Sequence, residues 1–414
     1  MKNKVGILSL GCPRNLVDSE NILGRLLLKG HAIVDMDKAD VGIVNTCAFI
    51  DEAKRESIDA ILDLIRLKKS GKLKKVIVYG CLSQRYKEEL KKELPEVDAF
   101  IGKVSLNHEV KRYPITPKHF AYLKVCEGCI NSCSYCVIPK IKGKFVSLEE
   151  EAILKKVAKF SAEKLSELNI IGQDITGYGV DICGKPELAA ILKKIVRQAK
   201  NIRWIRLLYL HPDRVGDDLL ELIRVEPKLC KYIDLPIQHI NNRILKLMNR
   251  STGRVEIEKL IKKVRKSIPG VAIRTSVITG FPTETEQEFK ELLDFIKEAK
   301  FDRLGAFTYS AEEGTRAFGL KPQVPDEVKR ERFDRIMTAQ QEVSVDNNRR
   351  LLGKTMEVLI DEKGEGTYLG RTQSDAPEVD GMVYVNSGRK LKPGDFVKVK
   401  ITDTLEYDLV GENL

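Results

Sequence analysis

The sequence predicts an α/β protein in three parts: an N-terminal parallel-sheet domain, a central partial (β/α)6 barrel and a small C-terminal β-barrel. Three observations support this prediction. Short β-rich runs alternate with amphipathic helical stretches at the start of the chain, six further strand candidates are each followed by enough residues for a helix, and the C-terminal end holds short strands separated by glycine turns. With 414 residues, of which 43% are hydrophobic, the chain can build more than one core.

The N-terminal domain is expected over residues 1–102. Its strand candidates are VGILSL, HAIVDM, VGIVNT and KKVIVYG, and helical stretches such as NLVDSENILGRLLLKG and DEAKRESIDAILDLIRLKK lie between them. Alternation of this kind is typical of strand–helix–strand units, which form parallel sheets. Residues 103–120 carry two prolines in a polar setting, so we expect a linker there.

The central barrel is expected over residues 121–348. Its six strand candidates are AYLKV, LNIIGQ, IRWIRLLYL, YIDLPI, VAIRTSVIT and RLGAFTY, and a long charged helix follows the last of them. Six such units indicate an open, partial barrel. Polar residues collect where these strands end, which is the C-terminal rim where such barrels place their active sites.

The last part, residues 349–414, is predicted to form a small β-barrel of the kind that binds nucleic acid or protein. The whole chain carries a net charge of +11, which favours a polyanionic partner such as RNA or the ribosome. Residues 353–414 hold 8 Lys and Arg against 12 Asp and Glu, a net charge of −4 that leaves +15 on the rest. An acidic barrel repels phosphate and suits a basic ribosomal protein, although a merely solvated acidic face is the alternative.

We expect a cytoplasmic protein with no membrane partner. The apolar run near the N-terminus is shorter than a secretory signal core, and charged residues interrupt every later hydrophobic segment. The chain contains nine cysteines, an odd number. In a reducing compartment, metal binding or catalysis is a better explanation for them than disulfides.

The strongest motif is Cys129-x3-Cys133-x2-Cys136, directly after the first barrel strand; we call these three residues the barrel trio. Three thiolates at this spacing can hold a 4Fe-4S cluster and leave its fourth iron open to a ligand. Cys126 adds a fourth thiol, which raises the alternative of a zinc ribbon. Structural zinc pairs are usually further apart, so we expect Cys126 to be a packing residue.

A second group consists of Cys12, Cys47 and Cys81, which we call the sheet trio. Each follows an apolar β run, so in a parallel sheet all three can meet at one rim, where open α/β sheets bind ligands. We predict a second cluster site here, with three unrelated buried cysteines as the alternative. Cys183 and Cys230 lack comparable partners and are expected to be packing residues.

Five segments together resemble the methylthiotransferase family of radical-SAM enzymes along essentially the whole chain: SLGCPRNLVDSE, VNTCAFI, YGCLSQRY, EGCINSCSYCVIP and GRTQSDAPEVDGMVYV. The first of them and RTQSDAPEVDG resemble the branch that modifies ribosomal protein S-twelve more than the tRNA-modifying branch. The resemblance implies an N-terminal cluster domain, a radical-SAM core and a C-terminal TRAM barrel, in agreement with the three parts predicted above.

The resemblance also implies an activity. The barrel trio would hold the cluster that binds S-adenosylmethionine (SAM), and the sheet trio would hold an auxiliary 4Fe-4S cluster that delivers sulfur. The enzyme would add a methylthio group to the β-carbon of an aspartate in ribosomal protein S-twelve of the small ribosomal subunit, with SAM as both radical source and methyl donor. An electron donor such as flavodoxin or ferredoxin is expected, and DNA is not expected as a partner.

Candidates for binding SAM are polar residues at the ends of barrel strands, and position alone selects them. The TGFPTE segment could equally be an ordinary strand-to-helix turn, and two histidines in the barrel, at 211 and 239, could equally be structural. The candidates are Gln173, Asp174, Gln238, His239, Thr279, Gly280 and Glu284.

One departure from the family pattern concerns Lys142 and Lys144, which stand where relatives usually have arginines. Lysine keeps the charge but lacks the bidentate fork of arginine, which puts the affinity for SAM in question. Two other functions stay open: a tRNA adenosine methylthiotransferase, and a non-catalytic metal-containing protein that binds RNA.

Overall fold

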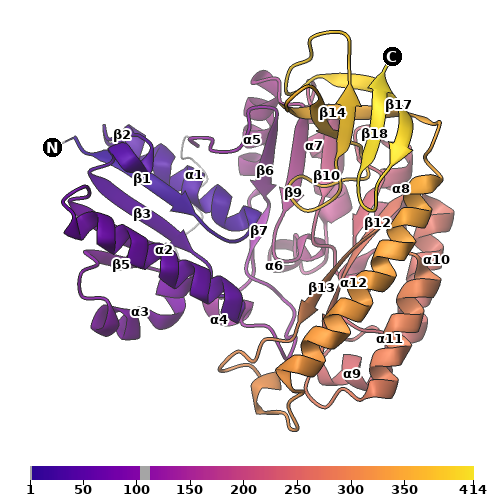
Figure 1. Cartoon of the computed structure of the whole chain (residues 1–414), viewed down its shortest axis with the longest axis horizontal. Helices are drawn as coiled ribbons and strands as arrows, with labels where there is room; N and C mark the ends of the chain where they lie inside the picture. The colour runs from indigo at the N-terminus through magenta and orange to yellow at the C-terminus, as the bar shows by residue number, and fades with distance from the viewer. Residues whose placement is uncertain (1, 103–111) are drawn as a thin grey trace.

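The computed structural model describes residues 2–102 and 112–414, and it divides into the three parts predicted from the sequence (Figure 1). The N-terminal sheet domain lies on the left of Figure 1, the larger barrel in the centre and right, and the C-terminal barrel at the top. Residues 103–111, the first part of the predicted linker 103–120, lie outside the described residues.

The N-terminal domain contains a five-stranded sheet in the order β2-β1-β3-β4-β5, and every pair of neighbours is parallel. The central strand β3 is buried along its whole length, because helices cover the sheet. The strands are β1 Lys4–Ser9, β2 Ala32–Ile33, β3 Val41–Thr46, β4 Lys75–Gly80 and β5 Ala99–Ile101, and the helices are α1 Pro13–Leu28, α2 Asp51–Lys69 and α3 Cys81–Glu93.

The central part is a partial barrel of six parallel strands that follow one another in chain order. They form two three-stranded sheets, β6-β9-β10 and β11-β12-β13, which meet at a parallel bridge between Ile205 and Leu229. The predicted partial (β/α)6 barrel is therefore confirmed. Its strands are β6 Phe120–Lys124, β9 Glu167–Ile171, β10 Trp204–Leu207, β11 Tyr232–Asp234, β12 Ala272–Thr279 and β13 Arg303–Thr308.

Helices pack around the outside of these strands. The main ones are α5 Glu150–Ala162, α7 Leu188–Gln198, α8 Asp217–Val225, α10 Arg254–Ser267, α11 Glu286–Ala299 and α12 Asp326–Arg349. Shorter elements lie between them: β7 Cys126–Glu127, α4 Ile138–Lys142, β8 Val146–Ser147, α6 Val180–Cys183 and α9 Asn242–Leu247.

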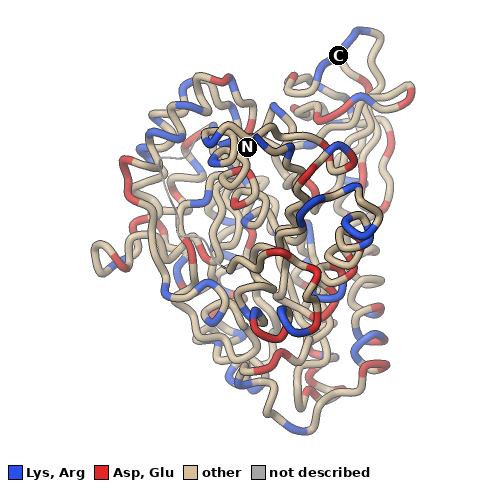
Figure 2. The backbone as a smooth tube through the Cα atoms, turned by 90° about the vertical axis from the view of Figure 1, so that its left-hand side faces the viewer, with Lys and Arg blue, Asp and Glu red and all other residues tan. Residues whose placement is uncertain are grey.

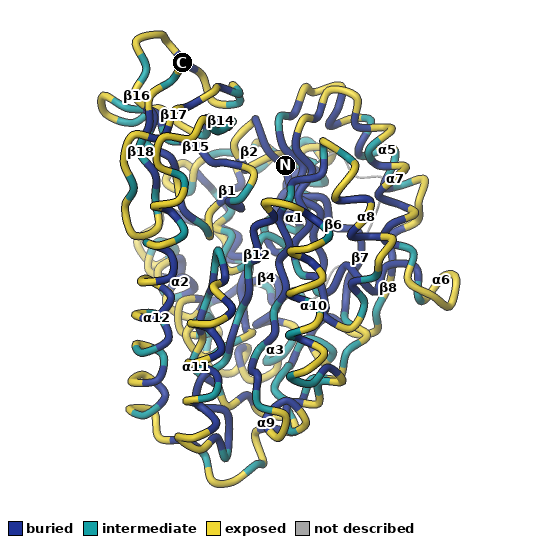
Figure 3. The backbone as a smooth tube through the Cα atoms, turned by 90° about the vertical axis from the view of Figure 1, so that its right-hand side faces the viewer, coloured by how far each residue is buried: buried dark blue, intermediate teal, exposed yellow. Residues whose placement is uncertain are grey.

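Alternation along the barrel strands separates two cores. Leu168 and Ile170 of β9 belong to the large apolar layer between strands and helices, whereas Tyr122 and Tyr232 belong to a smaller cluster that also takes in Leu359 of the C-terminal barrel. Successive strand residues point to opposite faces, which explains the division. In Figure 3, buried stretches follow the strands, while α10 and α11 alternate between buried and exposed stretches.

The C-terminal part is a closed barrel with the strand order β14-β15-β16-β18-β17, as predicted. It docks on the N-terminal ends of the strands of the larger barrel. The rings of Trp204 and Phe396 meet edge to face at 4.9 Å, and Arg371 bonds Glu167 at the start of β9. Its strands are β14 Thr355–Lys363, β15 Tyr368–Arg371, β16 Val383–Asn386, β17 Phe396–Thr404 and β18 Leu409–Asn413.

This docking neutralises the surplus of acidic residues in residues 353–414. Five of the twelve acidic side chains there bond to groups of the larger barrel or its flanking segment, and so does one of the eight basic side chains, Arg371. Seven acidic and seven basic residues remain outside these pairs, so their charges cancel. In Figure 2, charges of both signs are mixed over the molecule. The predicted attraction of a basic partner to an acidic barrel therefore loses its basis. The pairs are Glu357–Arg203, Asp361–His119, Asp375–Arg303, Glu378–Tyr122 and Asp380 with Tyr232 and Arg274.

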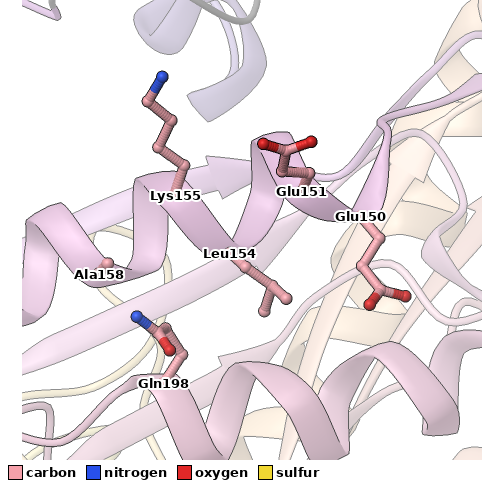
Figure 4. Close-up of a pocket in the computed structure, with 6 residues that line it drawn as sticks. All are labelled: Glu150, Glu151, Leu154, Lys155, Ala158 and Gln198. Carbon is pink, nitrogen blue, oxygen red and sulfur yellow. The ribbon is translucent and has the colours of Figure 1, made fainter.

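Among the described residues, no helix is both long and apolar enough to cross a membrane. A depression on the outside of the larger barrel lies between α5 and the end of α7 (Figure 4). Its lining comes from the outer helices rather than from the rim, and consists of Glu150, Glu151, Leu154, Lys155, Ala158 and Gln198.

Candidate metal centres

The sheet trio lies at the C-terminal ends of three adjacent parallel strands, β1, β3 and β4. Cys12 caps α1 and Cys81 begins α3, so two of the thiols lie at helix N-termini, where a thiolate is favoured. Burial raises the pKa of Cys47, and the nearby Cys12 raises it further. Burial also raises the pKa of Cys81 to about 12. These three thiols are close enough to influence one another, as a shared cluster requires.

Gly11 allows the loop of Cys12 to approach Cys47. Its φ is +82°, and a Cβ atom at this position would lie 2.8 Å from Cβ and 3.1 Å from Sγ of Cys47. Any other residue would thus meet both backbone strain and a clash with the side chain of Cys47.

We expect Gly11→Ala to weaken iron binding at the sheet trio, because the methyl group must push Cys47 away and the backbone strain adds about 1–3 kcal/mol. Iron content after a chelator challenge should fall towards about four irons per chain, the content of a single cluster. Gly30→Ala is the matched control, since Gly30 has φ +83° but its added Cβ would meet only Lys2, at 3.6 Å. Equal iron retention by both variants would contradict this role for Gly11.

The barrel trio lies in the loop between β7 and α4, at the end of the first barrel strand. Burial raises the pKa of Cys136 to about 12, and the thiols of Cys133 and Cys129 add to the rise. Two side chains donate to these sulfurs: Asn131 Nδ2 to Cys129 Sγ at 3.3 Å, and Arg250 Nη1 to Cys133 Sγ at 3.8 Å. Hydrogen bonds to sulfur tune the reduction potential of a cluster, so both donors suit a cluster site.

Neither trio forms a site for a single metal ion in the described structure. Among the residues that the structure describes, no three His, Cys, Asp or Glu side chains are grouped as ligands of one metal ion. A 4Fe-4S cluster makes a different demand, because each thiolate binds a different iron.

Arg14 lies between the two trios. Its Nε donates to Cys12 Sγ at 3.4 Å, its Nη1 donates to the carbonyl of Gly172 after β9 at 2.8 Å, and its guanidinium lies 4.4 Å from the ring centre of Tyr209. Burial would raise the pKa of Cys12, but the charge of Arg14 brings it below its ordinary value. The same charge counteracts the burial effect on the pKa of Cys136 in the barrel trio. The structure therefore brings both trios to one region at the barrel rim.

Buried ion pairs hold the N-terminal domain against the barrel. Asp18 of α1 binds Lys124 and lies 3.3 Å from Lys142, and both lysines also contact Glu127, at 2.5 and 3.5 Å. Lys142 thus serves an interdomain contact with two carboxylates, whereas Lys144 is exposed.

A second group of buried ion pairs joins the N-terminal domain to the larger barrel; we call this group and the one around Asp18 the two clamps. Glu312, after β13, is 1% exposed and binds Arg85 of α3 at 2.5 Å and Lys54 of α2 at 3.1 Å. Removing one partner of such a buried pair costs several kcal/mol, so the two clamps fix the sheet trio relative to the barrel trio.

The SAM candidates after β9 contact β7 and the loop that carries the barrel trio. Gln173 donates to Glu127 at 2.9 Å, and its own Oε1 is buried without a hydrogen-bond partner in the described structure. Asp174 accepts from Asn131 Nδ2 at 2.8 Å and also binds Arg214. Asp174 therefore orients the donor to Cys129.

The candidates after β11 and β12 differ in how many hydrogen bonds their side chains already make within the protein. His239 is fully buried, its Nδ1 accepts from the backbone N–H of Asn241 at 3.0 Å, and its Nε2 lies 3.5 Å from Glu284. Glu284 accepts from Arg332 at 2.7 Å and from the N–H of Gly280 at 3.0 Å.

Gly280 has φ +69°, and a Cβ there would lie 2.2 Å from Cγ of Lys329, so only glycine fits. Thr279 is buried and shares its hydroxyl with backbone carbonyls. Gln238 is half-buried with φ +71°, and it makes no side-chain hydrogen bond within the described part of the chain. Strained residues of this kind gather at functional sites. That any of these residues binds SAM stays a prediction.

The remaining cysteines and His211 were predicted to have packing or structural roles. Cys126 is buried and donates to the carbonyl of Asp174 at 3.6 Å, and Cys230 is buried, as expected of packing residues. The same prediction was wrong for Cys183, which lies exposed at the end of the short helix α6. His211 accepts from the backbone N–H of Asp213 at 3.4 Å, and burial lowers its pKa to about 4. It is therefore neutral near pH 7.

Sequence reasoning missed the side chains that support the trios. Arg14 and Asn131 each lie two residues after a trio cysteine, and this spacing was an available signal. Arg250 and Arg214 approach from separate loops far along the chain, and no local pattern points to them.

Family models match each of the three parts. The description "Uncharacterized protein family UPF0004" covers residues 4–102, the radical SAM superfamily covers 123–296, and the TRAM domain covers 352–414. Among solved structures, the radical SAM methyltransferase TsrM from Kitasatospora setae is similar in fold, with a TM-score of 0.53 and 12% identity, over 89% of this chain and 81% of that one. The matched models thus define the class as a radical SAM protein with a TRAM domain.

Curated relatives that match the whole chain identify its family within this class. The chain is 46% identical to the ribosomal protein uS12 methylthiotransferase RimO of Clostridioides difficile (strain 630), over 99% of both chains. It is 47% identical to the protein of the same name from Thermoanaerobacter sp. (strain X514), over 100% of both chains. This chain belongs to the RimO family and is a radical SAM methylthiotransferase. Membership excludes the non-catalytic RNA-binding alternative, and iron–sulfur and SAM chemistry belongs to its class.

Proposed function

We propose that this enzyme adds a methylthio group to the β-carbon of an aspartate in ribosomal protein uS12 of the small ribosomal subunit. The observation that carries the proposal is identity of 46–48% with uS12 methylthiotransferases over essentially the whole length of both chains. The aspartate is the substrate that the sequence resemblance implies. The tRNA adenosine alternative has no support from these relatives.

The proposal includes two 4Fe-4S clusters, with the barrel trio as ligands of one and the sheet trio as ligands of the auxiliary one. With both clusters and SAM bound, the chemistry supplied at the rim is hydrogen removal from an unactivated carbon and transfer of a methylthio group, with SAM as both radical source and methyl donor. An acid or base could not remove such a hydrogen, since it has no useful acidity.

The protein's own residues hold and orient these groups. Asn131 and Arg250 direct hydrogen bonds at two thiols of the barrel trio, and the Asp18 and Glu312 clamps keep the sheet trio over the barrel rim. The C-terminal barrel covers the opposite end of the strands, where Glu378 bonds Tyr122 at 2.9 Å. The target side chain would therefore enter from the rim, between the two trios.

Several finer assignments belong to the same proposal. We place the domains at 1–102, 121–348 and 349–414 with a linker at 103–120, and an electron donor such as flavodoxin or ferredoxin reduces the clusters. Location in the cytoplasm, without a membrane or DNA partner, is consistent with a ribosomal substrate. The SAM contacts proposed from strand ends are Gln173, Asp174, Gln238, His239, Thr279, Gly280 and Glu284.

Mass spectrometry of uS12 and of bulk tRNA from a strain lacking this enzyme tests the substrate. We expect the uS12 aspartate to lose the mass of the methylthio group and tRNA to stay unchanged, with recovery when the gene is restored. A methylthio group missing from tRNA instead would overturn the proposal in favour of the adenosine alternative.

A further inference from the structure

Arg14 lies between the two trios and has no carboxylate partner among the described residues. The structure pairs its Nε with Cys12 and its Nη1 with the carbonyl of Gly172, and its Nη2 has no hydrogen bond within the described residues. Its side chain is half-buried, so this nitrogen is not sealed in the core. A guanidinium group offers several donors in a fixed fork, and here part of that fork is available.

Three neighbouring cations are already neutralised by carboxylates. Lys124 and Lys142 share the carboxylates of Asp18 and Glu127. Arg214 binds Asp174. Arg250 also lacks a carboxylate partner, but it lies on the barrel side, where it donates to Cys133 Sγ and to the carbonyl of Pro236. Arg14 is the cation that bonds the sheet trio, reaches the barrel and still has an unbonded nitrogen among the described residues.

Its position is fixed from three directions. The stacking contact with Tyr209 comes from the loop after β10, the bond to Gly172 from the loop after β9, and the bond to Cys12 from its own helix start. A guanidinium held in this way loses little freedom when it binds a ligand, which favours binding.

We propose that Arg14 binds the side-chain carboxylate of the target aspartate and so positions its β-carbon between the trios. The inference rests on the proposed function. In aspartate the β-carbon is bonded directly to the carboxyl carbon, so fixing the carboxylate also fixes the carbon that reacts. Charge-assisted bonds from arginine to carboxylate are short and directional, which suits this task. Arg14 is thus a substrate-positioning residue that selects aspartate over its neutral isostere asparagine.

A two-by-two binding experiment isolates this contact. Anaerobically reconstituted enzyme, wild type or Arg14→Gln, is titrated with purified uS12 that carries either the target aspartate or asparagine at that position. We expect the wild type to prefer aspartate by about 10- to 100-fold, the range of a hydrogen bond to a charged group. The glutamine variant should lose most of this preference while its affinity for the asparagine protein changes little.

Arg66→Gln is the matched control, because it removes the same charge from an exposed position of the same domain. It should keep the wild-type preference. Iron content is measured for every variant, and if Arg14→Gln loses iron, Arg14→Lys replaces it, since the ammonium should retain a reduced preference for aspartate. An unchanged preference in Arg14→Gln, or equal losses for both substrates, would overturn the inference.

The outcome separates this inference from the proposed function. If the wild-type enzyme leaves uS12 unmodified, the proposed function fails. If it modifies uS12 but binds the aspartate and asparagine proteins equally well, only the role of Arg14 fails.

Discussion

Replacing all three cysteines of the barrel trio by alanine is expected to abolish SAM cleavage and to remove about four of about eight irons per chain. Replacing the sheet trio should remove the other four, abolish methylthio transfer and leave SAM cleavage in place. The difference follows from the separate positions of the trios, one in the barrel and one in the N-terminal sheet. Iron and sulfide analysis and assays of 5′-deoxyadenosine after chemical reduction measure both effects.

Cys126→Ala is the control for this experiment. Its thiol lies beside the barrel trio in the sequence but is buried against the carbonyl of Asp174. We expect full iron content and SAM cleavage in this variant. Loss of the whole iron content from either triple variant would contradict two independent cluster sites, and iron loss from Cys126→Ala would make that thiol a ligand.

Arg371→Met is expected to destabilise the joint between the C-terminal barrel and the larger barrel by about 3–5 kcal/mol. Arg371 is 3% exposed and binds Glu167 and Asp361, each at 2.7 Å. Methionine fills a similar volume but leaves Glu167, which is fully buried, with Arg206 as its remaining partner. With one of its two cationic partners gone, the buried charge of Glu167 is less well compensated, and this loss costs more than an exposed ion pair would.

Thermal unfolding and limited proteolysis between the barrels measure this effect. The variant should unfold at a lower temperature and release the C-terminal barrel sooner. Arg389→Met serves as the control, because Arg389 is an exposed arginine of the same barrel, where a change should stay within about 0.5 kcal/mol. Similar behaviour of the two variants would contradict a structural role for the Glu167–Arg371–Asp361 network.

Much of the fold could be predicted from local patterns. Each barrel strand lies within or next to its predicted segment, because alternating and continuous apolar runs report directly on burial. The sheet trio could be predicted for the same reason, because Cys12, Cys47 and Cys81 each lie at or shortly after the end of a strand, and parallel strands bring their ends together. The barrel trio was predicted from the spacing of its cysteines.

Contacts between distant segments could not be predicted in this way. Arg250 meets Cys133 across 117 residues, and Arg371 meets Glu167 across 204. The net charge of residues 353–414 gave a misleading prediction of a basic partner for the same reason. Counting charges does not reveal which of them bond to other parts of the same protein. Asp375 and Asp380 look like surface residues in the sequence, but they bind Arg303 and Arg274 of the larger barrel.

The ion pairs between the C-terminal barrel and the larger barrel, which we call the charged seam, also matter for exchanging domains between related enzymes. Asp375 and Asp380 come from one side of the seam, while Arg303 and Arg274 come from the other. A chimaera that took its TRAM unit from a distant relative would inherit one half of each pair and bury the mismatched charges. Such a chimaera is therefore expected to need matching substitutions on both sides of the contact before its two units pack together.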